Sequence, residues 1–255
     1  MRALRALRAA DLIACEDTRT SSVFLKRYRI SKPLVSLHLY NEKTQSERLL
    51  TALAEGKNVV VISDAGTPGI SDPGYLFFRD ALALGYEADV LPGPSAILPA
   101  VILSGLPPHP FLFYGFPPEK PGQRKKFLES LEELPYTMVF YVSPHKVERQ
   151  VSEMLTLWGD RKAALVREIS KIYQEAIRGS LSEIATRLAL GVKGEMVLVV
   201  KGRSENGRDS DSWKERAEEL LDEGHSVKTV ALEISELCGV PKNAVKDFLL
   251  RKTKT

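Results

Sequence analysis

Apolar and polar positions in the first hundred residues follow two alternating patterns. Short apolar runs, which are typical of strands, lie at residues 12–15, 34–39, 58–63 and 88–91. Segments with an apolar residue every three or four positions, which are typical of helices, lie at residues 4–12, 44–55, 75–84 and 96–104. The run 58–63 is rich in valine, which predicts a strand buried on both faces. Because strand, loop and helix repeat in order, we expect an α/β fold with a parallel sheet.

The pattern changes at the proline-rich segment 106–110, where we predict a domain boundary. Further apolar runs that predict strands follow at residues 111–114, 137–142, 163–167 and 196–200, with helices between them. A polar stretch then precedes a final segment with helical spacing. The predicted organisation is an N-terminal α/β subdomain at 1–108, a C-terminal α/β subdomain at 109–203, a linker at 204–212 and a small all-helical, helix-turn-helix-like unit at 213–255.

Composition excludes several classes of protein. Apolar residues make up 44% of the 255 residues and charged residues 27%, as in a folded globular protein. The longest apolar runs are too short to cross a bilayer, and the arginine-rich N-terminus is not followed by the apolar segment of a signal peptide. The two cysteines, Cys15 and Cys238, are far apart, and no zinc-binding spacing occurs. These features predict a cytoplasmic protein with reduced thiols, no metal site and no membrane segment.

The loop Asp64–Gly74 has the composition of a ligand-binding loop. Its three glycines allow a ligand to approach the backbone closely, and its two prolines restrict the loop before binding. It follows a strand predicted for the centre of the sheet, where open α/β sheets bind their ligands. The shorter loop Pro92–Ala96 has the same place in the next strand–helix pair, and its amides could hold a carboxylate. Neither loop has the glycine spacing of a nucleotide-phosphate site, and each could be a plain connection, with Ser95 as a helix cap.

Other polar and basic segments are open to two interpretations each. His145, after the strand 137–142, is a candidate acid or base, although such a histidine is more often a surface residue. The segment Arg167–Lys171 is either functional or a set of surface ion pairs. Residues 230–250 have a helix, turn, helix pattern, which binds nucleic acid in some proteins and is a packing or dimerisation pair in others. Side chains suited to phosphate contact are Lys120, Arg124, Lys125 and Lys126, and in the tail Lys242 and Lys246.

Six distinctive segments follow one another along the chain at residues 16–20, 64–74, 92–96, 113–117, 141–145 and 167–171. The strings Glu-Asp-Thr-Arg at 16–19 and Ser-Asp-Ala-Gly-Thr-Pro-Gly-Ile-Ser-Asp-Pro-Gly at 63–74 are far more specific than any short motif. In these segments the chain closely resembles the ribosomal RNA small subunit methyltransferase I family, a bacterial branch of the tetrapyrrole methylase superfamily. The resemblance covers residues 2–202 and extends into the helical tail. The two strings separate this branch from relatives that act on corrins, porphyrins or diphthamide.

The resemblance implies two α/β subdomains that bind S-adenosylmethionine in the cleft between them, and a homodimer. It also implies 2′-O-methylation of a cytidine in the decoding region of 16S rRNA, with the assembled small ribosomal subunit as the substrate. Thr67 replaces an aspartate of the family's cofactor loop, and we expect Asp64 to compensate. The cofactor-binding residues that the resemblance implies are Asp64, Gly66, Thr67, Pro68, Ile70, Ser71, Ser95, Ala96 and Met196.

The start of the chain departs from the family pattern. Family members begin with a strand and a Gly-Thr-Pro-Ile-Gly-Asn-Leu-like loop ahead of the helix that matches Leu4–Leu7, and this first strand is missing here. We expect either a start codon assigned too late or a shortened chain. The strand would pair inside the first sheet and its loop would help to form the active cleft. Its loss would leave unpaired backbone groups and exposed apolar surface.

Methyl transfer to a ribose hydroxyl calls for a proton acceptor, because the hydroxyl is a weak nucleophile at neutral pH. The candidate catalytic residues are Glu16, Asp17 and Glu168, while Arg19 and Lys171 are candidates for holding phosphate. Two other functions stay open: methylation of a small tetrapyrrole, and a catalytically inactive module that binds RNA or assists ribosome assembly. Cofactor binding and the choice of methyl acceptor distinguish the three.

Overall fold

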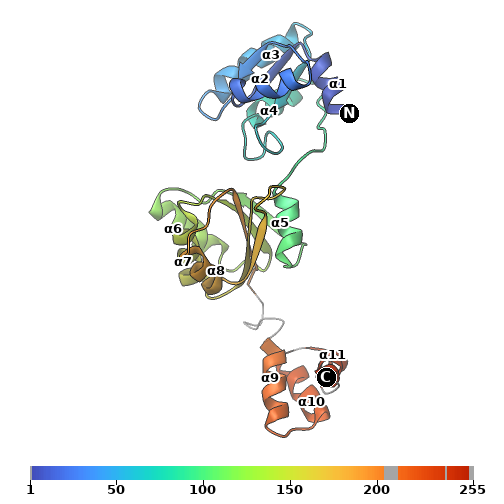
Figure 1. The fold of residues 1–255 in the computed structure, drawn as a ribbon, viewed down its shortest axis with the longest axis vertical. Coiled ribbons are helices and arrows are strands. Elements are labelled where there is room, and N and C mark those ends of the chain that lie inside the picture. Colours follow the sequence, from blue (N-terminus) through green and yellow to red (C-terminus); the bar gives the residue numbers. More distant parts are fainter. Residues whose placement is uncertain (1, 204–211, 239, 253–255) are drawn as a thin grey trace. The chain divides into compact units, whose positions relative to one another are not determined.

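The computed structural model describes residues 2–203, 212–238 and 240–252. The chain divides into two compact units, Met1–Pro99 and Ala100–Thr255 (Figure 1). This division cuts through a helix, so the domain boundary predicted at residues 108 and 109 stays a prediction. The predicted linker 204–212 lies almost entirely outside the described residues.

The first unit contains a three-stranded parallel sheet in the order β2-β1-β3. Its elements are α1 (Arg2–Ala9), β1 (Leu12–Cys15), α2 (Thr18–Arg27), β2 (Leu34–Ser36), α3 (Glu42–Ala54), β3 (Val59–Ile62) and α4 (Tyr75–Ala83). The predicted parallel sheet is thus confirmed. The apolar spacing did not predict α2, whose first turn is the polar run that follows β1.

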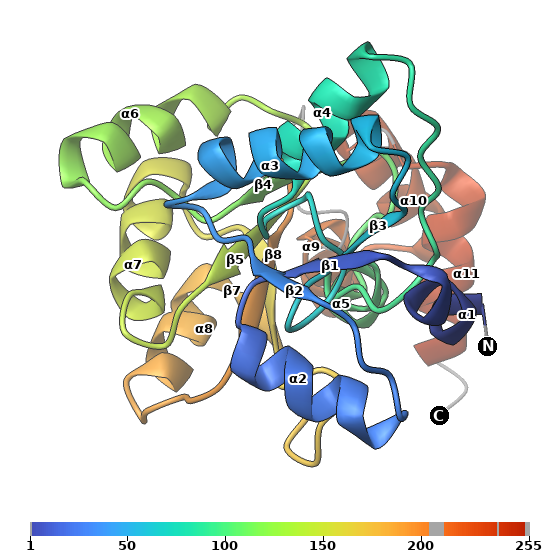
Figure 2. The same ribbon diagram turned by 90° about the horizontal axis from the view of Figure 1, so that it is seen from above.

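Alternation along β1 sends successive side chains to opposite faces of this sheet. Ala14 belongs to a core with Leu49 of α3 and Phe77 of α4. Ile13 belongs to the other core, with Leu7 of α1 and Leu25 of α2. Figure 2 shows α2 and α3 on opposite sides of the strands. The sheet therefore lies between two helical layers, as expected for an α/β fold.

Two strand predictions in this unit are wrong. Residues 88–91 form no strand, and Val90 is 63% exposed. Val59–Ile62 do form β3, but all four side chains are only half-buried instead of buried on both faces. Both results have one physical cause: within the described residues the sheet ends at β3. A strand needs a neighbour for its backbone groups, and residues 88–91 do not pair with β3 or with any other described strand.

The second unit contains a five-stranded mixed sheet in the order β4-β5-β8-β6-β7. Only β4 and β5 pair in parallel, and the other neighbours are antiparallel. The apolar pattern predicted every strand here except β7, whose side chains are mostly half-exposed. The elements are α5 (Ile97–Ser104), β4 (Phe111–Gly115), α6 (Pro121–Leu131), β5 (Thr137–Val142), α7 (Val147–Trp158), β6 (Lys162–Arg167), β7 (Glu175–Ser180), α8 (Leu181–Leu188) and β8 (Met196–Val200).

One face of this sheet carries the main core of the second unit. Leu128 of α6, Met154 of α7 and Ile184 of α8 pack in one cluster with Phe140 and Leu198 of the sheet, and all five are fully buried. Helix α5 lies on the other side of the sheet from these three helices (Figure 1). There the Arg178 Nε of β7 donates to the Leu103 carbonyl oxygen at 2.6 Å.

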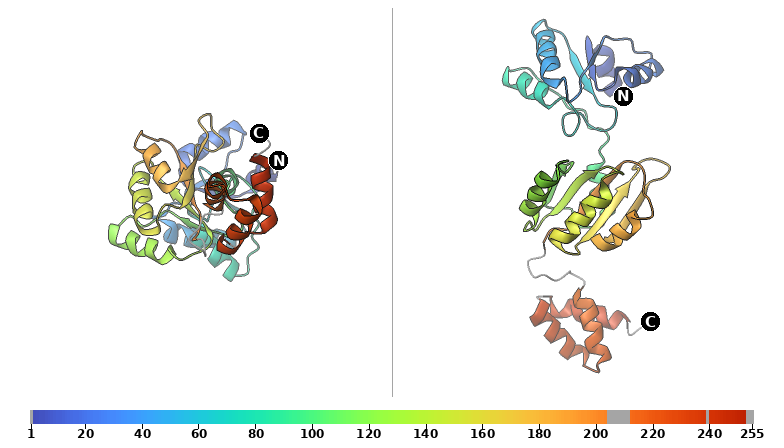
Figure 3. Two further views of the ribbon diagram at one scale, coloured as in Figure 1. Left: turned by 90° about the horizontal axis from the view of Figure 1, so that it is seen from below. Right: turned by 90° about the vertical axis from the view of Figure 1, so that its left-hand side faces the viewer.

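The C-terminal helices form a small bundle with its own core (Figure 3). The helices are α9 (Ser212–Asp222), α10 (Val227–Cys238) and α11 (Lys242–Lys252). Ala217, Val230, Ile234 and Val245 are buried in this core, and the Trp213 ring packs edge-on against Phe248 at a centroid distance of 5.3 Å. The predicted helical C-terminal part is thus confirmed over the described residues. No helix in the described ranges has the length and apolarity that a bilayer span requires.

Candidate functional site

The carboxyl ends of the three parallel strands meet at one edge of the first sheet. Strand β1 is followed there by Glu16 and Asp17, β2 by the turn His38–Asn41, and β3 by the loop Asp64–Gly74. Parallel strands place the segments that follow them at the same edge, which is where open α/β sheets bind ligands. The structure thus brings together most of the candidate residues of the first unit.

Glu16 is the half-buried carboxyl at this edge. Its backbone oxygen accepts a hydrogen bond from the Ser36 hydroxyl at 3.4 Å, which ties it to the end of β2. Burial raises the pKa of Glu16, and the negative charges of Asp72 and Asp64 raise it further. Burial also raises the pKa of Asp72. A carboxylate with a raised pKa holds a proton more tightly, so Glu16 is a stronger base than an exposed glutamate.

Asp17, the residue after Glu16, has a structural role at the start of α2. Its Oδ1 accepts from the backbone N–H of Arg19 at 2.8 Å and so caps the N-terminus of α2. Its Oδ2 pairs with the Arg19 guanidinium at 2.9 Å, and these bonds to Arg19 lower the pKa of Asp17. Asp17 is therefore a weaker base than Glu16. The Arg19 side chain is still 90% exposed and accessible to an anion.

The loop Asp64–Gly74 is anchored at its end by a residue that the sequence patterns did not single out. The carboxylate Oε1 of Glu42, on the first turn of α3, accepts from the backbone N–H groups of Gly74 at 2.8 Å and Leu76 at 3.0 Å. Glu42 is 9% exposed and caps the start of α4. The sequence position of Glu42 could have indicated this role, because Glu42 closely follows β2 at the edge where the ligand-binding loops lie.

The two loops predicted to bind the cofactor lie against each other. The Thr67 hydroxyl donates to the Pro94 carbonyl oxygen at 3.0 Å. Gly66 and Gly69 have φ of +96° and +84°, which favours glycine, and a methyl group at Gly66 would stand 4.0 Å from the Pro94 oxygen. Thr67 thus uses its hydroxyl to join the two loops.

The donor set of these loops fits a nucleoside with an amino-acid side arm. Asp64, Gly66 and Ile70 are exposed, and Ser71 and Ser95 are half-exposed. A carboxylate and hydroxyls can bind ribose and ammonium groups, and an exposed isoleucine side chain can cover an adenine face. Pro68 and Ala96 lie in the same two loops. The residues present therefore suit S-adenosylmethionine without any change of side chain.

The second unit contains the predicted cofactor contact Met196, the candidate base Glu168 and the candidate phosphate contact Lys171. Met196 begins β8, is 3% exposed, and pairs with Val142 and Arg167 on the neighbouring strands. The carboxylate Oε1 of Glu168 accepts from the Glu195 backbone N–H at 2.9 Å and from Lys171 Nζ at 3.0 Å. The bond from the Glu195 amide, followed by the Lys171 ammonium, lowers the pKa of Glu168. Glu168 is thus a poor base, and Lys171 holds the turn after β6 together.

The prediction that Arg124 contacts RNA is wrong. Its side chain is 1% exposed and pairs with both carboxylate oxygens of Glu153, at 2.5 Å and 2.8 Å. Its Nη1 donates to the carbonyl oxygens of Pro118 and Glu119 at 3.0 Å and 2.7 Å. The guanidinium therefore holds the start of α6 and is not available to phosphate. The neighbouring Lys120, Lys125 and Lys126 are exposed.

Replacing Arg124 by alanine should destabilise the protein by about 3 kcal/mol, because it leaves the Glu153 carboxylate and two carbonyl oxygens without their donor. Urea denaturation followed by circular dichroism measures this change. Lys125→Ala is the matched control, since Lys125 is 70% exposed in a loose 3.7 Å pair with Glu129. It should cost less than about 0.5 kcal/mol. Equal effects of the two substitutions would contradict the structural role of Arg124.

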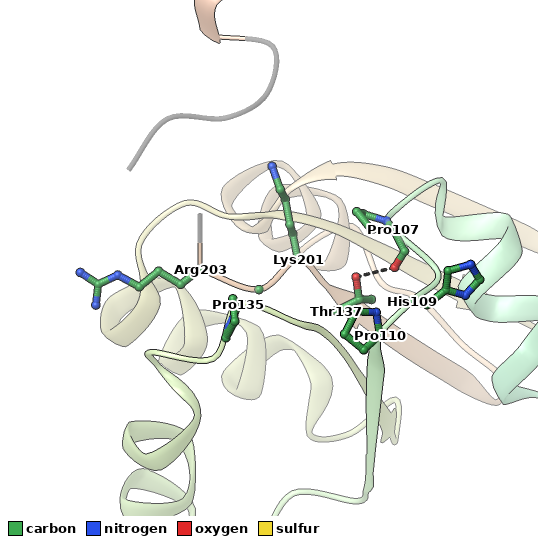
Figure 4. Close-up of a pocket in the computed structure, with 8 residues that line it drawn as sticks. Pro107, His109, Pro110, Pro135, Thr137, Lys201 and Arg203 are labelled. Atoms are coloured by element: carbon green, nitrogen blue, oxygen red, sulfur yellow. Dashed lines mark hydrogen bonds between the residues drawn. The ribbon is translucent and has the colours of Figure 1, made fainter. Parts of the chain in front are cut away.

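The other candidate groups belong to the second unit. In the bundle, Lys242 is exposed and Lys246 half-exposed on α11. A cavity of about 310 Å³ in the second unit is lined by none of the predicted site residues (Figure 4). There the Thr137 hydroxyl donates to the Pro107 oxygen at 2.7 Å, and Arg203 points away from the other lining residues (Figure 4). Across residues 2–203, 212–238 and 240–252, no group of three or more His, Cys, Asp or Glu side chains is arranged to hold a metal ion.

Comparison with known proteins gives one consistent result. A family model described as Tetrapyrrole (Corrin/Porphyrin) Methylases matches residues 1–185. A protein of Xylella fastidiosa named Ribosomal RNA small subunit methyltransferase I is 37% identical over 248 residues, which are 96% of this chain and 91% of that protein. A protein of the same name from Mesorhizobium japonicum is 40% identical over 258 residues, which cover 100% of this chain and 87% of that protein.

Two solved structures share the fold. The methyltransferase CobJ superposes with a TM-score of 0.58 and 22% identity, over 79% of this chain and 87% of that one. A diphthine synthase superposes with a TM-score of 0.59 and 18% identity, over 80% of this chain and 84% of that one. At these identities the likeness concerns the fold alone.

Proposed function

This chain belongs to the tetrapyrrole methylase family, and we propose that it is the methyltransferase that modifies a cytidine 2′-hydroxyl in the decoding region of 16S rRNA. The predicted family and the methyltransferase class are confirmed by the comparisons. S-adenosylmethionine is the cofactor. The proposal includes the assembled small ribosomal subunit as substrate, a homodimer as the working form and the cytoplasm as the location.

One observation supports the proposed chemistry. Among the three candidate bases only Glu16 has a raised pKa, and Glu16 lies at the same sheet edge as the cofactor loops. Asp17 and Glu168 have lowered pKa values and are held by Arg19 and Lys171. Glu16 therefore accepts the proton of the ribose hydroxyl. Asp17 orients α2 so that Arg19, two residues further along the chain, is placed for a phosphate.

The loops Asp64–Gly74 and Pro92–Ala96 hold the cofactor, and Met196 is a further candidate contact from β8. When bound, S-adenosylmethionine would supply a methyl group on a sulfonium, and these residues would hold it near the acceptor oxygen. Glu42 fixes the end of the first loop, and Thr67 fixes the distance between the two loops. This pre-formed geometry reduces the entropy that binding would otherwise cost.

Exposed cations supply the RNA contacts in the proposal. Lys120, Lys125 and Lys126 lie around the start of α6, and Lys242 and Lys246 lie on α11. Helix α11 is the second helix of the pair α10–α11, which is the position of the nucleic-acid-contacting helix in helix-turn-helix units. The described part of the bundle has its own buried core, so it can act as a separate RNA-binding module.

Transfer of labelled methyl from S-adenosylmethionine to small subunits that lack the modification tests the proposed function. Digestion of the labelled rRNA to nucleosides should yield 2′-O-methylcytidine. Labelling of a tetrapyrrole in place of rRNA would assign the chain to small-molecule methylation. Binding of RNA without binding of the cofactor would assign it to ribosome assembly.

Replacing Lys242 and Lys246 by glutamate should weaken binding to 16S rRNA and flatten its salt dependence. Each lost phosphate contact lowers the slope of log K against log salt by about 0.7–0.9. Filter binding between low and moderate salt measures the slope. The pair Glu218→Lys and Glu219→Lys on α9 is a charge-changing control in the same bundle. An unchanged slope in the lysine variant would remove α11 from the RNA interface.

A further inference from the structure

We propose that the turn His38–Asn41 is a platform for an unstacked RNA base, with Tyr40 stacking on that base beside Glu16. The inference rests on the proposed function and deepens it, because it names the group that positions the acceptor nucleotide. Neither the apolar pattern nor the specific strings of the sequence pointed to this turn.

The turn is held rigidly from within. Oδ1 of Asn41 accepts from the His38 backbone N–H at 2.8 Å, and Nδ2 of Asn41 donates to the Ser36 carbonyl oxygen at 3.1 Å. The Asn41 backbone N–H also donates to the His38 carbonyl oxygen at 2.9 Å. At the other end, the Leu37 side chain is 1% exposed in the core of the first unit. Four residues are thus fixed before any ligand arrives.

This rigid turn presents its apolar side chains to solvent. Tyr40 is 99% exposed and Leu39 is 67% exposed. The Tyr40 ring lies edge-on to the His38 ring at a centroid distance of 6.2 Å. One face of an exposed aromatic ring on a fixed backbone is the geometry with which proteins stack single-stranded bases.

The platform adjoins the base that accepts the proton. The Leu37 backbone N–H donates to the Cys15 carbonyl oxygen at 2.8 Å, so the turn leaves the sheet directly beside Glu16. His38 interacts electrostatically with the Glu16 carboxyl. A nucleotide whose base stacks on Tyr40 therefore has its ribose near Glu16.

The charges around the turn favour an RNA base over an apolar protein surface. Glu16, Asp64 and Asp72 make the inner part of the edge negative, which repels phosphate but not an uncharged base. Lys43 on the first turn of α3 and Arg19 on α2 are exposed cations that can hold the flanking phosphates. This arrangement favours an RNA base at the inner edge, with the sugar-phosphate backbone of the RNA on the outside.

Tyr40→Ala should raise the Kd for a single-stranded RNA carrying the target sequence by about 5- to 150-fold, the range of one lost base–aromatic stack. Tyr40→Phe should bind as tightly as the original chain. Because the side chain is 99% exposed, neither substitution should change the melting temperature or the affinity for S-adenosylmethionine. With 2-aminopurine in place of the target cytosine base, fluorescence should be quenched by the original chain and by Tyr40→Phe, but not by Tyr40→Ala.

Tyr28→Ala is the matched control, since Tyr28 is a partly exposed tyrosine at the far end of α2. Unchanged RNA affinity and quenching in Tyr40→Ala would overturn the inference, while methylation by the original chain would leave the proposed function intact. A loss of dimer in sedimentation, with RNA affinity unchanged, would assign the turn to a second copy of the chain and equally overturn it. Absence of methylation by the original chain would remove the proposed function and this inference with it.

Discussion

Glu16→Gln should lower the rate constant of methyl transfer by about 10²- to 10⁴-fold, the usual contribution of a positioned proton acceptor. Glutamine keeps the size and the hydrogen-bonding capacity of glutamate but cannot take the proton of the ribose hydroxyl. Affinity for S-adenosylmethionine and for RNA should stay within about twofold, because the cofactor loops are fixed by other residues, Glu42 and Thr67. Single-turnover methylation at saturating substrate measures the rate constant.

The pH dependence of the same reaction identifies the residue. Burial and the charges of Asp72 and Asp64 raise the pKa of Glu16, so the active, deprotonated form is lost as pH falls through a higher value than for an exposed glutamate. The rate should therefore rise with pH through that raised pKa in the original chain and become flat there in Glu16→Gln. Glu47→Gln on the exposed face of α3 is the matched control and should leave both rate and profile unchanged. A full rate in Glu16→Gln would exclude Glu16 as the base.

Sequence reasoning succeeded where local patterns decide the structure. The strands at 12–15, 137–142 and 196–200 have the predicted bounds, because their apolar runs are buried in a sheet. The loop Asp64–Gly74 lies at the predicted edge, because the order of strand, loop and helix fixes it there. The family strings then supplied the chemistry that periodicity alone could not.

Sequence reasoning failed where a residue's partner is distant in the chain. Arg124 and Lys125 are indistinguishable as charges in the sequence, and only the fold shows that Glu153 buries one of them. The candidates Glu16, Asp17 and Glu168 could not be ranked either, since the rank depends on burial and on the ion pairs with Arg19 and Lys171. Residues 88–91 have strand composition but no neighbour, which no local pattern reports.

A parallel strand added to the free edge of β3 should extend the first sheet. Within the described residues β3 pairs only with β1, and its four side chains are half-buried. The variant carries a family-type strand and Gly-Thr-Pro-Ile-Gly-Asn-Leu-like loop joined ahead of Arg2. Backbone amides of β3 that face the new strand should exchange with deuterium about tenfold more slowly, as expected for one added hydrogen bond each.

The added strand also changes the chemistry, because its loop emerges at the carboxyl edge where Glu16 and Asp64 lie. Transfer of labelled methyl to small subunits should therefore increase in the extended chain. An extension with proline at the centre of the strand is the matched control, since proline cannot donate to the ladder and should restore fast exchange and the lower labelling. If both extensions give the same exchange rates, β3 does not accept a neighbour. If exchange slows and labelling does not increase, the new strand pairs with β3 but its loop adds nothing to catalysis. The three parallel strands, with Glu16 and the two cofactor loops, would then suffice for the reaction.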